Sequence, residues 1–471
     1  MVRLTTEGSV RGASELLERD EQLRLLLQRF EGVRLSGQGH VVLVRGEAGI
    51  GKTTLVRHFC GGAPPSTPVV WCACDPLFTP RPLGPLLLAT GGSVGVLEEL
   101  AGGDALPHEV AAALVQELRA RSPTVFVLED VHWADEATLD VLRLLSRRVE
   151  TVPALVVVTY RDDEIELVRP LRVVLGELVG ADATTRLSLS RLSTEAVSEL
   201  AAPSGFDAGE LYRKTGGNPF FIGEVLAADG VEVPDTLRDV ALARATRLSD
   251  DGRSLLEAAA IVPAHVELWL LEAVAGAALA SLEECVACGM LVHEPAGTRF
   301  RHELSRLAID DAIPPNRKVD LHRKALVALA APPTGALDVA RLAHHAEAAA
   351  DVDAVLRFAP IAAVRAASLG AYREAAAQYA RALRFGGQLS SSERAVLLEH
   401  RADACHVTDD YDGGIATLED ALECHRRTGD ELGEGRVLAR LSEFLWCPGR
   451  TDEAEARARG NRGARALASR A

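Results

Sequence analysis

The chain has 471 residues, of which 48% are hydrophobic and 25% charged, and its 51 basic and 67 acidic residues give a net charge of −16. This is the composition of a globular protein with sizeable cores, and it excludes a disordered chain, a collagen-like fibre and a disulfide-framed miniprotein. The acidic excess argues against a protein that coats a nucleic-acid backbone. The sequence has neither a membrane-spanning stretch nor a signal-peptide segment, so we expect a cytoplasmic protein with no membrane contact.

Short apolar runs alternate with helical patterns in the first part of the chain. The runs lack alternating polarity, which is typical of parallel strands covered on both faces. They predict strands at residues 40–44, 69–72, 125–128 and 154–159. Apolar residues at helical spacing predict helices at residues 14–31, 109–121 and 136–149. We therefore expect a doubly wound α/β domain over residues 37–185, after which the strands are expected to stop.

The rest of the chain reads mainly as helical. An N-terminal segment at 1–36 precedes the α/β domain, and residues 186–235 predict a small helical domain. Residues 236–331 predict helices followed by a hairpin near 291–301, the arrangement of a winged-helix domain. From residue 332 to 471 only helical patterns follow.

A short motif recurs in this last region at intervals of 39 and then 40 residues. Its copies are Gly370-Ala371-Tyr372-Arg373-Glu374-Ala375, Asp409-Asp410-Tyr411-Asp412-Gly413-Gly414 and Gly449-Arg450-Thr451-Asp452-Glu453-Ala454. Small and apolar residues at helical spacing follow each copy, which predicts a solenoid of helical pairs of tetratricopeptide type. We expect the array to be incomplete in this chain.

The strongest motif follows the first strand and matches the pattern G-x-x-x-x-G-K-[ST]. It reads Gly46-Glu47-Ala48-Gly49-Ile50-Gly51-Lys52-Thr53, with Thr54 next. Its backbone N–H groups and the N-terminus of the following helix are expected to hold the phosphates of ATP or ADP. Lys52 is expected to reach the β and γ phosphates, and the Thr53 hydroxyl to bind Mg²⁺.

Two further groups stand at the ends of buried strands, where parallel sheets bind their ligands. Glu129 and Asp130 follow the strand at 125–128, where one acid would hold Mg²⁺ and the other would orient or deprotonate water. Position favours Glu129 for the metal, but the assignment stays open. Arg161 follows the fourth strand and is expected either to contact the γ-phosphate or to be an ordinary surface arginine.

These residues resemble the signal-transducing ATPases with numerous domains (STAND), a branch of the AAA+ class of P-loop ATPases. The likeness is nearest to the ATPase region of large MalT-like regulators of the LuxR family of transcription regulators. It rests on five segments, Glu18-Arg19-Asp20-Glu21-Gln22-Leu23, Leu128-Glu129-Asp130-Val131-His132-Trp133-Ala134-Asp135, Thr159-Tyr160-Arg161-Asp162, Gly217-Asn218-Pro219-Phe220-Phe221 and Phe300-Arg301-His302-Glu303. The resemblance implies that Arg19 lies near the adenine, that Pro219 packs on the base, and that His302 reaches the β-phosphate of ADP.

The resemblance also implies a function, that of an ATP/ADP switch with slow hydrolysis. ATP would favour self-association, and an unknown inducer or protein partner would bind the helical repeats. The winged-helix segment would close on the nucleotide without reading DNA, so we expect no direct DNA binding from this chain. The alternatives are a constitutive ATPase or small-molecule kinase, and a repeat scaffold with a degenerate nucleotide site. His344-His345 and Cys424-His425 lack a third ligand at useful spacing, so no metal beyond Mg²⁺ is expected.

Overall fold

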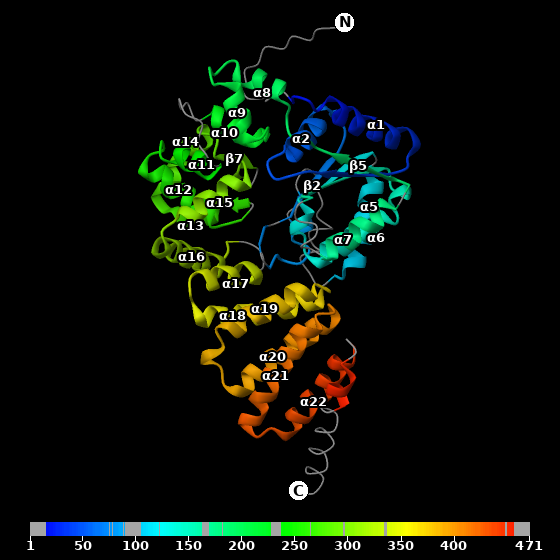
Figure 1. Cartoon of the computed structure of the whole chain (residues 1–471), viewed down its shortest axis with the longest axis vertical. Coiled ribbons are helices and arrows are strands. Elements are labelled where there is room, and N and C mark those ends of the chain that lie inside the picture. Colours follow the sequence, from blue (N-terminus) through cyan, green and yellow to red (C-terminus); the bar gives the residue numbers. More distant parts are fainter. Residues whose placement is uncertain are drawn as a thin grey trace.

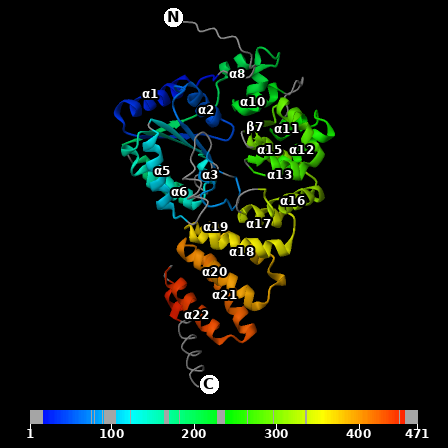
Figure 2. The same cartoon turned by 180° about the vertical axis from the view of Figure 1, so that it is seen from behind.

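The computed structural model describes residues 16–455, apart from 75, 78, 88, 90–104, 122, 163–168, 181, 228–236, 264, 295–296, 334–336 and 448–449. An α/β domain, drawn blue to cyan, lies beside a mainly helical unit drawn green (Figure 1). Helices drawn yellow to red continue below both of them, and the view from behind shows the same arrangement (Figure 2).

The centre of the α/β domain is a five-stranded parallel sheet with the strand order β2-β3-β4-β1-β5. Its strands are β1 His40–Arg45, β2 Val69–Ala73, β3 Thr124–Glu129, β4 Ala154–Tyr160 and β5 Thr184–Ser188. The first four are the strands that the apolar runs predict. Because β4 lies between β1 and β3, the chain segments that follow these three strands emerge side by side at one edge of the sheet.

Strand β5 corrects two expectations. It pairs with β1 in parallel register from Val41–Thr184 to Arg45–Ser188, so the strands do not stop after the fourth. The expected domain boundary at residue 185 consequently falls inside a strand. The sequence Thr-Thr-Arg-Leu-Ser buries only Leu187, because β5 is an edge strand, and it therefore lacks the apolar run that marks its neighbours.

Helices cover both faces of the sheet, as the strand pattern predicts. They are α1 Asp20–Ser36, α2 Lys52–Gly62, α3 Gly84–Leu87, α5 Pro107–Ala120, α6 Glu136–Ser146 and α7 Arg169–Val179. Val42 and Val44 of β1 pack with α1 and α2 on one face, whereas Val41 and Leu43 pack with α5, α6 and α7 on the other. The helix expected at 14–31 begins at Asp20, and residues 14 and 15 lie outside the described part.

The second unit holds helices and a small sheet. Its helices are α8 Thr194–Ala201, α9 Ala208–Thr215, α10 Pro219–Leu226, α11 Leu237–Ala245, α12 Asp250–Ala260, α13 Leu268–Ala275, α14 Leu282–Ala287, α15 Glu303–Ala312 and α16 Pro315–Leu329. The expected hairpin is present as β7 Leu291–Glu294 and β8 Gly297–Phe300, which pair antiparallel. Strand β6, His265–Glu267, adds a third strand that the helical interpretation of this region missed.

The remaining described chain consists mainly of consecutive helices. They are α17 Val339–Ala348, α18 Val352–Ser368, α19 Tyr372–Arg384, α20 Ser391–Val407, α21 Tyr411–Thr428 and α22 Glu431–Trp446. The first two motif copies begin at Gly370 and Asp409, which both have left-handed backbone, with φ of 79° and 57°. Each begins the turn before α19 or α21, so the repeat marks the connection inside a helical pair. In the third copy Gly449 lies outside the described residues, and residues 451–455 are helical.

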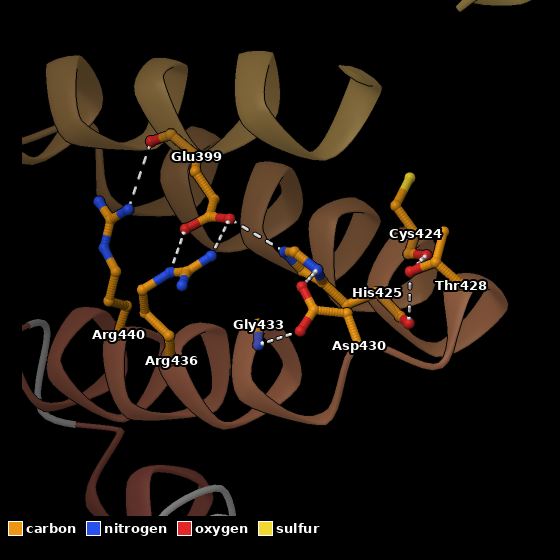
Figure 3. A network of polar contacts seen from close by, with 8 residues as sticks. All are labelled: Glu399, Cys424, His425, Thr428, Asp430, Gly433, Arg436 and Arg440. Carbon is orange, nitrogen blue, oxygen red and sulfur yellow. Dashed lines mark hydrogen bonds and ion pairs between the residues drawn. The ribbon is translucent and has the colours of Figure 1, made fainter. Parts of the chain in front are cut away.

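Polar contacts fasten three of these helices together (Figure 3). The Glu399 carboxylate on α20 accepts hydrogen bonds from His425 Nε2 at 2.9 Å and from Arg436 Nε at 2.8 Å. His425 Nδ1 also lies 3.0 Å from the Asp430 carboxylate, which caps the N-terminus of α22. One acid on α20 therefore holds both α21 and α22 in place.

Apolar packing runs across the expected boundary at residues 331 and 332. The core of the second unit, which includes Leu321 and Leu326 of α16, continues into Leu342 of α17 and Phe358 of α18. Small residues of α18 and α19 pack in the core of the α/β domain. The first repeat helices are therefore anchored on both larger parts. Among the described residues, no helix is both long and apolar enough to span a bilayer.

Helix packing in the repeats makes a prediction at Gly414. A Cβ atom at this position of α21 would lie 2.1 Å from Cε1 of Phe444, a side chain that is 1% exposed. We expect Gly414→Ala to destabilise the repeats by about 1–3 kcal/mol, because the buried ring must move. Thermal unfolding followed by circular dichroism should show a lower Tm.

Gly387→Ala is the matched control, since a Cβ there meets nothing within 4 Å. Its Tm should equal that of the parent protein. An unchanged Tm for Gly414→Ala would contradict the close packing of α21 against α22.

Candidate functional site

The loop between β1 and α2 has the geometry that its glycines allow. Gly46, Gly49 and Gly51 have φ of 153°, 74° and 98°, values that side chains rarely adopt. A Cβ on Gly49 would also lie 2.8 Å from Cβ of Phe220, so this position must stay free of a side chain. No side chain caps the N-terminus of α2, which leaves its first N–H groups for an anion.

Lys52 lies inside this loop. It is only 6% exposed, and its ammonium group donates to the carbonyl oxygens of Gly46 at 2.7 Å and Glu47 at 2.9 Å. The positive charge therefore sits beside the helix N-terminus, where both favour the same anionic group. This arrangement fits the phosphate chain of a nucleotide.

A hydrogen bond joins the Thr53 hydroxyl, at the start of α2, to the Glu129 carboxylate, at the end of β3. Thr53 Oγ1 donates to Glu129 Oε1, and the indole Nε1 of Trp71 donates to Glu129 Oε2 at 2.9 Å. Hydroxyl and carboxylate oxygens are the ligand types that Mg²⁺ prefers, so the donor set fits this ion. The sequence did not point to Trp71, because only the pairing of β2 with β3 brings it beside Glu129.

Asp130 occupies the turn after β3. Its backbone is left-handed, with φ of 55°, and its N–H donates to Thr159 Oγ1 at 2.9 Å. Burial, and then the nearby Glu129 carboxylate, raise the pKa of Asp130 to about 7, against the opposing effects of Lys52 and Arg161. A carboxylate with that pKa suits proton exchange with a water molecule.

Arg161 follows β4 and faces the same site. Its guanidinium carbon lies 4.7 Å from the ring centroid of Trp133, a cation–π contact that fixes its direction. Its charge acts on Asp130 and, together with burial and Lys52, lowers the pKa of His132 to about 2. Arg161 is therefore near enough to Asp130 for its charge to lower the pKa of that carboxyl.

Arg19 is buried and binds the chain backbone. Its guanidinium donates to the carbonyl oxygen of Ser190 at 2.7 Å and to that of Ile50 at 3.4 Å. The preceding Glu18 accepts a hydrogen bond from the Ser193 N–H at 2.9 Å. This segment thus ties the phosphate-binding loop to the chain that follows β5, and the observed contacts of Arg19 position the loop.

The turn at 217–220 packs directly against the phosphate-binding loop. Asn218 Nδ2 donates to the Ala48 carbonyl at 2.9 Å, and the Phe220 N–H donates to the Gly49 carbonyl at 3.2 Å. Pro219 is the first residue of α10, a position that suits its missing N–H. Sequence reasoning assigned a role to Pro219, whereas the contacts are made by its two neighbours.

Within the second unit, His302 packs against Phe220. The ring of His302, just before α15, lies 4.3 Å from the Phe220 ring centroid. Burial, followed by Arg301, Arg299 and Arg244, lowers the pKa of His302 to about 3, so the ring is neutral. Glu303 acts on the pKa of Asp130, which also places the start of α15 near the acidic pair.

The site is also joined to the helical repeats. Glu136, in the first turn of α6, donates its N–H to Glu374 Oε1 at 3.2 Å, and its carboxylate accepts the Arg373 N–H at 3.0 Å. The guanidinium Nε of Arg373 lies 2.8 Å from Glu136 Oε1. The N-termini of α6 and α19 therefore face each other, each with a glutamate bonded to the other's backbone.

The comparisons with known proteins identify the first domain. Residues 15–158 match the family of the AAA ATPase domain, a match that includes the phosphate-binding loop and both acids. This family implies nucleotide binding, normally with Mg²⁺. The expected AAA class is therefore confirmed.

An uncharacterized protein of Rhizobium meliloti (strain 1021) is 30% identical over 460 residues, which covers 82% of this chain and 44% of that protein. The chain thus spans less than half the length of this relative.

Among solved structures, one neighbour is a STAND protein with a tetratricopeptide repeat sensor from Pyrococcus horikoshii. Its TM-score is 0.48 at 15% identity, and the match covers 94% of this chain and 77% of that chain. Another is Cdc6p from Pyrobaculum aerophilum, with a TM-score of 0.34 at 12% identity over 64% of this chain and 96% of that chain. Both likenesses are distant. The chain contains an AAA-type domain on a parallel sheet, followed by a helical region.

The contact between α6 and α19 predicts a dependence on pH. Burial, then Asp135 and Glu136, raise the pKa of Glu374 to about 8. A pKa raised by folding means that the stability contribution is present at low pH and is lost as pH rises through about 8. Glu374→Gln keeps the acceptor oxygen without the charge, so its Tm should exceed that of the parent at pH 9 by about 2 °C or more, and by less at pH 6.

The exposed Glu423→Gln on α21 is the control and should show no such trend. If the Tm of Glu374→Gln differs from that of the parent by the same amount at pH 6 and pH 9, the raised pKa of Glu374 is contradicted.

Proposed function

We propose that this chain is a nucleotide-dependent regulatory switch of the STAND type. Its AAA-type domain would bind ATP or ADP, hydrolyse ATP slowly, and change its contacts with the helical parts accordingly. The observation that carries the proposal is Phe220, which contacts Gly49 of the phosphate-binding loop and the ring of His302 at once. Phe220 and its neighbour Asn218 thereby connect the phosphate-binding loop to the unit that contains His302.

The residues around the loop would have separate roles in binding the nucleotide and in hydrolysing it. The N–H groups from Gly46 to Thr54 and the Lys52 ammonium would hold the phosphates. Thr53 and Glu129 would hold Mg²⁺, which neutralises phosphate charge when bound. Asp130 would accept a proton from the attacking water, a role that its raised pKa supports.

His302 is the proposed sensor of the diphosphate state. Its neutral ring carries one N–H that can donate to a β-phosphate oxygen, and Phe220 positions the ring. ADP would then hold the second unit closed against the loop, while Pro219 and Phe220 form the wall near the base. Arg161, beside Asp130, would interact with the γ-phosphate that only ATP brings.

The repeats would receive this signal through α6. Glu136 follows Asp130 by a few residues and contacts Arg373, so a shift at the acidic pair would reach α19 through a short segment. We propose that ATP favours self-association and that an inducer or protein partner binds the tetratricopeptide-like helices.

We extend the proposal to a transcription regulator of the LuxR type, of which this chain would be the ATPase part. The support is the His132-Trp133-Ala134-Asp135 segment after the two acids, together with the winged-helix-like unit that contains His302. A net charge of −16 supports the view that this chain does not itself bind DNA.

Nucleotide content and particle mass test the switch. The purified chain should hold ADP as a monomer, and light scattering should show a larger particle with ATP and Mg²⁺. Lys52→Ala should lose at least about tenfold in nucleotide affinity, because a hydrogen bond to a charged group contributes about 1.5–3 kcal/mol. It should stay monomeric with ATP.

Lys324→Ala, on the exposed side of α16, is the control and should behave as the parent. Steady turnover at constant mass would favour a constitutive ATPase or a kinase. If Lys52→Ala keeps full function, the chain is a repeat scaffold.

The sensor assignment predicts a selective effect of His302→Asn. ADP affinity, measured by calorimetry, should fall about tenfold or more, since one hydrogen bond to a charged oxygen is lost. ATP affinity should change much less. His293→Asn, a change of an exposed histidine on β7, should leave both affinities unchanged. Equal losses for ADP and ATP would show that His302 does not distinguish the two nucleotides.

A further inference from the structure

The structure corrects one expectation about metals. The sequence predicts no third ligand for His344 and His345 of α17, but His322 of α16 packs against both of them. One ring nitrogen from each histidine lies within 4.8 Å of the others, the one such group of three found among the described residues. His322 and His345 are buried, and His344 is half-buried. Sequence spacing does not reveal His322, because it lies on a different helix from the other two histidines.

The distances between the rings match those of a metal site. At a Zn–N distance of about 2.0–2.1 Å, tetrahedral ligation separates two ligating nitrogens by about 3.3 Å and two ring centroids by about 5 Å. The observed centroid distances are 5.0 Å for His322–His345, 5.0 Å for His344–His345 and 5.7 Å for His322–His344. The Nδ1 atoms of His322 and His345 are 2.9 Å apart. The three rings are therefore clustered and inclined to one another, not stacked in parallel.

The three imidazoles lie in the protein interior. Burial lowers the pKa of His322 to about 4 and that of His344 to about 3, and it lowers the pKa of His345 well below its ordinary value. Neutral imidazoles each carry one nitrogen lone pair. The Nδ1 atoms of His322 and His345 face each other, and only one of the two can donate a hydrogen. The other Nδ1 atom therefore presents a lone pair inside the cluster.

Both basic and acidic side chains surround the cluster. The basic side chains near the cluster each pair with an acid, as Lys318–Asp310 at 2.8 Å, Arg341–Glu267 at 2.7 Å, Arg381–Glu347 at 2.7 Å and Arg306–Glu303 at 2.6 Å. Glu347 also pairs with Arg384, so this carboxylate is shared between two arginines. Asp310 and Glu347 are near enough to oppose the lowering of the histidine pKa values, so negative charge also faces the cluster.

We propose that His322, His344 and His345 bind one divalent transition-metal ion, with Zn²⁺ the best match to three imidazole ligands and an open fourth position for water. The site lies where α16, the last helix of the unit that contains His302, meets α17, the first helix of the following array. A bound ion would join α16 to α17, two helices that are otherwise held together by packing. The proposal is independent of the nucleotide switch.

Metal binding by the full chain tests this site directly. After a chelator wash and reduction, equilibrium dialysis against Zn²⁺ in excess Mg²⁺ should leave one Zn²⁺ per chain bound to this cluster. His344→Gln should weaken binding at least tenfold, since even outer-shell changes cost about 10–100-fold. His108→Gln, at an exposed position of α5, is the control and should bind as the parent. Zn²⁺ should also raise the Tm of the parent but not that of His344→Gln.

Cobalt(II) distinguishes the histidine cluster from the cysteine pair Cys285 and Cys288 on and just after α14, which are free thiols. The proposed site should give weak visible bands without the intense near-ultraviolet band of thiolate ligation. His322→Asn provides a second variant if His344→Gln fails to fold. Equal Zn²⁺ binding by the parent and the folded variants, no binding by the parent, or a thiolate spectrum would each overturn the proposal.

Discussion

The close approach between Gly49 and Phe220 is the contact on which the arrangement of this chain depends. Because Gly49 has no side chain, the Phe220 N–H reaches its carbonyl oxygen at 3.2 Å and the ring packs over the loop. The Phe220 ring in turn packs against the ring of His302 in the second unit. A glycine usually explained by phosphate binding thus also sets the position of residues that stand more than 150 positions further along the chain.

The opposite side of the α/β domain has a comparable constraint. Asp135 caps α6 and is fully buried, and it also accepts the Leu83 N–H at 3.1 Å, so the start of α6 cannot move alone. The next residue, Glu136, accepts a hydrogen bond from the Arg373 N–H and so attaches the start of α6 to α19. The acidic residues after β3 therefore lie between two attachment points, one on the hairpin unit and one on the repeats.

The sequence predicted the parts of the site that are local in the chain. The loop from Gly46 to Thr53, the acids after β3 and four strands follow from short patterns, and the structure places them together at one edge of the sheet. It did not predict β5, whose edge position removes the apolar signal. Trp71 and His322 were missed for another reason, since each acquires its partner through strand order or helix packing, which no spacing in the sequence encodes.

The energetics of the proposed switch require several of these contacts to act together. Inverting a 1:99 balance of two states takes about 5.5 kcal/mol of differential binding. One hydrogen bond from His302 to a charged oxygen supplies about 1.5–3 kcal/mol, which is too little alone. Glu303 beside Asp130 adds repulsion between carboxylates that separation of the second unit would relieve. The closed arrangement thus contains both an attraction that ADP can strengthen and a repulsion that favours opening, and the balance between them sets the response.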